Sequence, residues 1–179
     1  MTLSAAGLAF APSAATAAVD AESTLVISEV YGGGGNSGAP LSRDFIELAN
    51  TGDESVDLTG YSVQYASATG SSWQVTPLGA IELPAGEQLL IGQASGSNTS
   101  LPGVDADVEG TIAMSGSGAK VALVSSETPL AGASGIADLD QVVDLVGWGS
   151  TASAFAGTAP APGTTNATSV SRDAEFSNT

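Results

Sequence analysis

The sequence predicts an all-β protein that folds as an antiparallel β-sandwich, and three observations lead to this prediction. Short runs in which apolar and polar residues alternate recur at intervals of roughly 8–15 residues. No segment shows the 3.6-residue periodicity of an amphipathic helix. The chain has 23 glycines among 179 residues, enough turn-forming residues to separate many short strands within one domain.

The first two strands are expected at residues 24–31 and 43–50, and the rest of the chain reads as their continuation. In the first run, strict alternation places Val30 on the face opposite Leu25 and Ile27. Four consecutive glycines between the runs predict a flexible loop that joins two strands, because glycine adopts positive φ as readily as negative.

The later strands follow the same pattern of short runs bounded by turn residues. They are expected at residues 55–58, 61–67, 72–75, 87–92, 107–113, 120–125, 141–147 and 168–172. The runs 61–67 and 72–75 flank Gly70 and should form a hairpin. Residues 151–165 are rich in Ala, Gly, Pro and Thr, which indicates a segment without regular structure.

The two ends of the chain differ in composition from the strand-rich part. Residues 1–18 resemble a truncated signal peptide, with a short apolar run followed by the small residues Ala15-Thr16-Ala17 of a cleavage site. That run is too short to span a membrane, which takes about 20 apolar residues. Residues 19–23 are expected to be a linker, 24–172 the domain and 173–179 a truncated C-terminal end.

Charge and residue usage exclude several classes of function. The chain has three Lys+Arg against 19 Asp+Glu, a formal net charge of −16, and its cations are Arg43, Lys120 and Arg172. Direct binding to nucleic acid or to an anionic membrane surface is disfavoured, since both depend on Lys and Arg. With no His and no Cys, a catalytic triad, a thiol nucleophile and disulfides are excluded.

Eight segments, in order and at family-like spacing, carry a resemblance to a known family. They are residues 27–34, 44–50, 56–63, Trp73, 81–86, 110–115, 118–124 and 144–149. In these segments the chain resembles the lamin-tail domain in its bacterial, secreted form. The resemblance implies an immunoglobulin-like antiparallel β-sandwich over residues 24–172, and no catalytic residues or cofactor carry over from it.

The resemblance also implies a role outside the cell. Such bacterial domains accompany extracellular nucleases of the endonuclease/exonuclease/phosphatase type or other hydrolases, as attachment or accessory modules. The leading expectation is therefore a secreted, non-catalytic module that binds a protein, a cell surface or a C-terminal hydrolase domain. The alternative is the N-terminal fragment of an extracellular nuclease whose catalytic domain lies outside this chain.

Two features are candidates for contact with a partner. The loop with Gly32, Gly33, Gly34, Gly35 and Asn36 joins the first two strands, and loops often carry binding residues. Trp148 lies between two glycines at a strand end, where its indole could be exposed to a partner or could be part of the core. The other aromatic residues could extend a binding platform or supply bulk to a core built of small side chains: Trp73, Tyr31, Tyr61 and Tyr65.

The carboxylates suggest two further hypotheses. Glu29 and Glu47 should share one face of adjacent strands, where they could serve as the acid and base of a glycosidase, bind a cation, cap loop amides or pair with Arg43. Acidic groups that could hold Ca²⁺ through oxygen ligands are Asp105, Asp107 and Glu109, which alternate along one segment, and Asp138, Asp140 and Asp144. Neither acidic group follows the EF-hand spacing, and a solvated acidic loop has the same composition.

Overall fold

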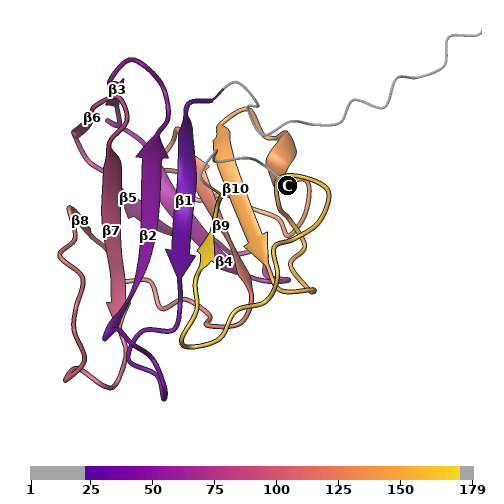
Figure 1. The fold of residues 1–179 in the computed structure, drawn as a ribbon. Coiled ribbons are helices and arrows are strands. Elements are labelled where there is room, and N and C mark those ends of the chain that lie inside the picture. Colours follow the sequence, from indigo (N-terminus) through magenta and orange to yellow (C-terminus); the bar gives the residue numbers. More distant parts are fainter. Residues whose placement is uncertain (1–22, 174–179) are drawn as a thin grey trace, which may run out of the picture.

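The computed structural model describes residues 23–173, which form two β-sheets packed face to face (Figure 1). Along the chain the strands are β1 (Leu25–Tyr31), β2 (Arg43–Asn50), β3 (Val56–Asp57), β4 (Ser62–Ser67), β5 (Gln74–Pro77), β6 (Glu82–Leu83), β7 (Gln88–Ser95), β8 (Val108–Glu109), β9 (Ala119–Val124), β10 (Val142–Trp148) and β11 (Val170–Ser171). One sheet has five strands, in the order β11-β1-β2-β7-β8, and the other has four, in the order β10-β9-β4-β5. β3 and β6 pair separately.

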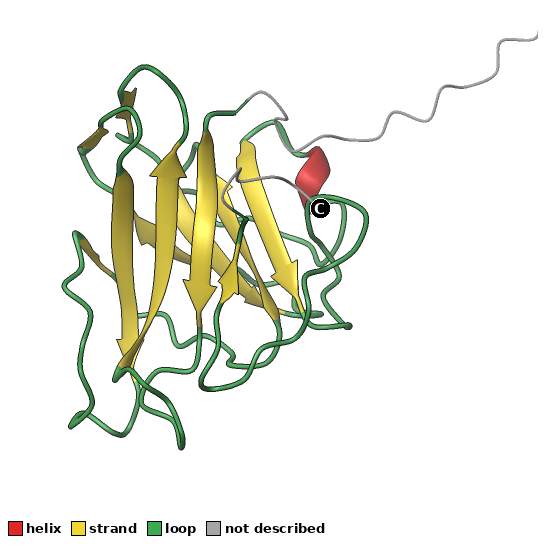
Figure 2. Ribbon diagram, viewed as in Figure 1, coloured by secondary structure: helices red, strands yellow, loops and turns green. Residues whose placement is uncertain are grey.

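The predicted all-β antiparallel sandwich is confirmed. Every strand pair is antiparallel except β7 with β8, which is parallel. In the described part of the chain, helix is limited to one 3-10 turn, η1 (Ile136–Asp138) (Figure 2). The same part contains no helix that is long and apolar enough to cross a membrane. The predicted signal peptide at 1–18 lies outside the described residues, as do most of the predicted linker and of the C-terminal end.

The main core lies between the two sheets and depends on a bulge in β1. The pairing of β1 with β2 shifts register between Ile27 and Glu29. This extra residue returns Val30 to the same buried cluster as Leu25 and Ile27. The prediction that Val30 faces away from them is therefore wrong, because strict alternation holds only until a bulge interrupts it.

A second apolar cluster covers the outer face of the four-stranded sheet. All six residues of β9 are buried, because alternate side chains enter the main core and this second cluster. Trp73, Leu130 and Ile136 pack over the sheet from the segments around it. The four-stranded sheet is thus buried on both faces, whereas the outer face of the five-stranded sheet keeps half-exposed side chains such as Glu29 and Glu47.

Some predicted elements differ in extent. Of the strand predicted at 107–113, only the two residues of β8 form a strand. The N–H of Ile112 donates to the side-chain Oε1 of Gln93 at 3.0 Å and not to a main-chain carbonyl of a neighbouring strand. The segment 151–165 has no regular structure, as predicted, but it contributes buried Ala152 and Ala154 to the apolar packing. Neither of these contacts can be read from local alternation, because both join residues distant in the sequence.

One buried ion pair ties the two sheets together at the edge where β1 and β10 approach. Nη2 of Arg172 lies 2.7 Å from Oδ1 and 2.9 Å from Oδ2 of Asp144 on β10. The main-chain N–H of Ile27 on β1 donates to the same carboxylate at 2.7 Å, and Nε of Arg172 donates to the carbonyl of Ile27 at 2.9 Å. The Asp144 carboxylate therefore accepts a hydrogen bond from the N–H of Ile27, and the Arg172 guanidinium donates one to its carbonyl. Without these two side chains both main-chain groups would be buried without partners.

The substitution Asp144→Asn should destabilise the protein by about 3–5 kcal/mol, because it removes a buried carboxylate charge that pairs with Arg172 and accepts the N–H of Ile27. Glu109→Gln is the matched control. Its side chain is 67% exposed where it pairs with Arg43, so the expected loss is much smaller than in Asp144→Asn. Urea unfolding at neutral pH measures both values. Equal losses in the two variants would contradict a special role for the buried pair.

Candidate functional site

The four-glycine loop is a packed junction and not a flexible binding loop. Gly32, Gly33, Gly34 and Gly35 are all buried. A Cβ at Gly33 would collide with the backbone of Asn166, and each of the other three also faces backbone atoms at clashing distance. The prediction that these glycines contact a partner is corrected: they are there because a larger residue would not fit. The exposed part of this loop begins at Asn36.

The aromatic residues do not form an exposed platform. Trp148 is 1% exposed and belongs to the main core, so its predicted contact with a partner is wrong. Trp73 lies in the second cluster, as the core interpretation predicted, and its Nε1–H donates to the carbonyl of Gly132 at 3.0 Å. Tyr31 and Tyr65 are also buried. The indole and phenol rings supply the bulk that the small aliphatic side chains lack.

Glu29 and Glu47 share one face, as predicted. They are directly opposite each other in the pairing of β1 with β2. Glu47 accepts hydrogen bonds from Oγ of Ser28 at 2.7 Å and from Nε2 of Gln88 at 2.9 Å. The alternative in which these glutamates pair with Arg43 is wrong, since Arg43 forms its ion pair with Glu109.

The first acidic group is exposed, and two of its members have other roles. Asp105, Asp107 and Glu109 are all exposed on one side of their segment, as their alternation predicted. Oδ2 of Asp107 accepts the N–H of Leu90 at 2.9 Å, while the Arg43 side chain bonds to Glu109 and lowers the pKa of that carboxyl. These bonds hold the β8 segment against β7.

The second acidic group is not assembled. Asp138 and Asp140 are exposed on the loop around η1, whereas Asp144 is buried in its pair with Arg172. Within residues 23–173, no three acidic side chains come together as a set that could hold a metal ion. Calcium binding stays a prediction from sequence, without a geometric site to support it.

Asp44 is a buried carboxylate that sequence reasoning did not single out. Its Oδ1 accepts the N–H of Gly34 at 2.8 Å, and its Oδ2 accepts the N–H of Met114 at 2.8 Å. Burial raises the pKa of Asp44, and the two main-chain donors partly offset that rise. Its carboxylate therefore fixes the packed glycine loop to the segment before β9. An acidic residue at the start of an apolar strand was the only sequence signal for it.

Lys120 is a second buried charge, and the sequence did not predict its burial. Its Nζ donates to the carbonyls of Gly70 at 2.8 Å and Ala133 at 2.9 Å, and to Oγ of Ser153 at 2.9 Å. The ammonium also lies 5.3 Å from the centroid of the Trp73 ring, within the range of a cation–π contact. Burial lowers the pKa of Lys120. The lysine thus joins three segments that cover the outer face of the four-stranded sheet.

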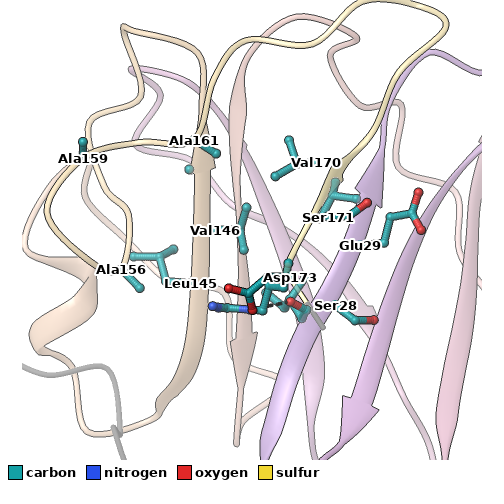
Figure 3. A pocket seen from close by; sticks show the side chains of 14 residues that line it. Ser28, Glu29, Leu145, Val146, Ala156, Ala159, Ala161, Val170, Ser171 and Asp173 are labelled. Carbon is teal, nitrogen blue, oxygen red and sulfur yellow. Dashed lines mark hydrogen bonds between the residues drawn. The ribbon is translucent and has the colours of Figure 1, made fainter. Parts of the chain in front are cut away.

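A groove opens between the two sheets where the edges of β1 and β10 diverge (Figure 3). This seam groove has a volume of about 290 Å³. Ile27 to Val30 of β1 line one side, and Leu145 to Gly147 of β10 line the other. We call residues 151–173 the strap, because this segment runs along the same edge and closes the groove with small side chains such as Ala156, Ala161 and Val170.

The strap is bonded to both strands that border the groove. The N–H of Ala161 donates to the carbonyl of Gly147 on β10 at 2.8 Å, and that of Arg172 donates to Ser28 on β1 at 2.9 Å. β11, which belongs to the strap, pairs with Glu29 and Val30. The groove is therefore bordered by main chain and by small apolar side chains and stays partly open, an arrangement suited to binding and without a set of reactive groups.

These features define an antiparallel β-sandwich whose buried charges hold the fold and which has a groove at one edge. The Lamin Tail Domain model matches residues 18–150, about three quarters of the chain, and the chain belongs to this family. Its fold is therefore immunoglobulin-like, and domains of this kind are non-catalytic and of the protein-interaction type. A comparison with curated proteins finds no match. The strap lies beyond the matched residues.

The native protein should have a higher free energy of unfolding than the variant Lys120→Met, and this difference should grow as the pH rises toward 10.5. Between its lowered folded pKa and 10.5, Lys120 is protonated in the unfolded chain and neutral in the folded one, so folding becomes more favourable as the pH rises. At neutral pH the variant should be less stable by ~1–3 kcal/mol, because Gly70, Ala133 and Ser153 lose a donor.

Urea unfolding across the alkaline range measures this difference. Burial raises the pKa values of Tyr31 and Tyr65, which lowers stability at high pH, but both tyrosines are present in the two proteins and cancel in the difference. A difference that stays constant or shrinks toward pH 10.5 would show that burial does not disfavour the ammonium.

Proposed function

We propose that this chain is a secreted, non-catalytic accessory module that binds a protein partner. The observation that supports this proposal most directly is that the buried charged side chains are bonded to other groups of the fold. Asp44 bonds to main-chain N–H groups, Lys120 to main-chain carbonyls, and Asp144 to Arg172. Buried carboxylates and amines are the usual acid, base and nucleophile candidates, and here each has a structural role.

The glutamate pair is the remaining arrangement with a catalytic interpretation. Glu47 is already hydrogen-bonded by Ser28 and Gln88 and does not line the seam groove, whereas Glu29 lies at the border of that groove. A glycosidase requires its two carboxylates on opposite sides of a bound sugar. This geometry favours a binding role over a hydrolytic one.

The accessory role also accommodates the nuclease alternative. In that proposal the chain accompanies a nuclease domain of the endonuclease/exonuclease/phosphatase type and positions it. The net charge of −16 makes direct contact with the nucleic acid unfavourable, so the substrate would be bound by the catalytic domain. A cell-surface protein and a hydrolase domain are both protein partners.

The function predicts binding without catalysis. Purified full chain, labelled with a fluorophore, should bind intact bacterial cells and lose this binding after the cells are treated with protease. Its hydrolysis of DNA and polysaccharides should equal the buffer rate and stay unchanged in the double variant Glu29→Gln, Glu47→Gln. A rate above buffer that the double variant abolishes would contradict the proposal, as would binding that survives the protease.

Export of the module rests on residues 1–18. We propose that cleavage follows the small residues Ala15-Thr16-Ala17, as in a signal peptide. Mass spectrometry of the full chain expressed in a bacterium should find the protein outside the cytoplasm, with its first residue directly after Ala17. A matched variant, Ala17→Arg, should remain unprocessed because a large charged residue blocks the cleavage site. Identical processing of the two proteins would contradict the assignment.

A further inference from the structure

The seam groove is bordered by two strand edges that already bind extended polypeptide. Along β10, the carbonyl of Leu145 accepts the N–H of Ala156 at 3.1 Å, and Gly149 donates to Ala161 at 2.9 Å. Along β1, β11 is paired as an antiparallel strand. The strap therefore forms main-chain hydrogen bonds with the edges of both β1 and β10, as a strand would, but only over short stretches. The groove lies between these two edges (Figure 3). This is the geometry by which sheet edges accept an added segment.

The side chains around the groove limit the size of what can enter. Val146, Ala156, Ala159, Ala161 and Val170 are small or β-branched. A volume of about 290 Å³ holds a few small apolar side chains and not an aromatic cluster. The described residues that line the groove include no aromatic ring on which a sugar could stack, which disfavours a polysaccharide.

The charge of the groove sets the sign of its partner. Glu29 lies at the border of the groove, and Arg172, which also lines it, is paired with the carboxylate of Asp144. Glu29 is half-buried at the border, so a cation there would be partly shielded from solvent. The whole chain has a charge of −16, which attracts a cationic partner from a distance and repels an anionic one.

We propose that the seam groove binds an extended segment of a partner polypeptide in which small apolar side chains alternate with lysine or arginine. The apolar side chains fill the space beside Val146 and Val170, and the cation pairs with Glu29. Alternation is required because successive side chains of an extended segment point to opposite sides. This inference rests on the proposed function, since it names the surface and the chemistry of the partner.

The test uses the full chain and a short labelled peptide that alternates valine and lysine, with fluorescence anisotropy as the measurement. The peptide should bind, and a matched peptide of valine and glutamate should not. Ala159→Trp, which enlarges an exposed residue of the groove, should weaken binding about tenfold. Ala167→Trp enlarges an exposed alanine of the strap that does not line the groove, and it should bind as the native protein does.

A second pair of variants tests the charge. Glu29→Gln should weaken binding about two- to fivefold, as expected for one partly exposed ion pair, and Glu82→Gln, at an exposed residue of β6 outside the groove, should have no effect. Equal binding of the lysine and glutamate peptides would overturn the proposal, and so would unchanged binding in Ala159→Trp. If neither peptide binds while the full chain still shows protease-sensitive binding to cells, the groove is not the site and the accessory function stands.

Discussion

The rest of the sandwich depends on the contact of the Asp144 carboxylate with Arg172 and with the main chain of β1. Two bulges lie beside this contact, one in β1 between Ile27 and Glu29 and one in β10 between Val142 and Asp144. A bulge interrupts the ladder of its strand and re-aims the next side chains. The N–H of Ile27 donates to the carboxylate, so the two sheets are joined at an edge where no ladder connects them. At this edge the ion pair takes the place of main-chain hydrogen bonds between β1 and β10.

Much of the fold could be predicted because its strands alternate locally. The hairpin of β4 with β5 and the pairing of β1 with β2 both follow from runs of β-branched and aromatic residues bounded by turns. The side of the sheet on which Val30 lies could not be predicted, because a bulge leaves no mark in a single sequence. The 3-10 turn at Ile136–Asp138 was missed for a related reason: it forms where a loop folds back to cover β9, and three residues carry no periodicity.

The site was less predictable, because burial of a loop is a tertiary property. Four glycines indicate freedom of the backbone, but here the same residues are needed because Asn166 and Ser115, distant in the sequence, lie against them. Trp148 shows the same limit, since its flanking glycines suggested exposure while the opposite sheet encloses its ring. Lys120 did leave a signal. A single lysine within the apolar run of β9 must either face solvent or find buried acceptors, and a strand covered on both faces permits only the second.

The three cationic side chains of the protein all bond to groups within the fold, and this explains why the groove should prefer a basic partner. Arg43 holds β2 to β8 through Glu109, Lys120 holds the loops over the four-stranded sheet, and Arg172 holds the seam. Each is fixed by partners within the described residues, so none can turn outward without breaking the contact that it maintains. Ion pairs across an interface of this protein must therefore take their cation from the other molecule. The protein contributes carboxylates and small apolar side chains, and in the seam groove both line the same open space between strands.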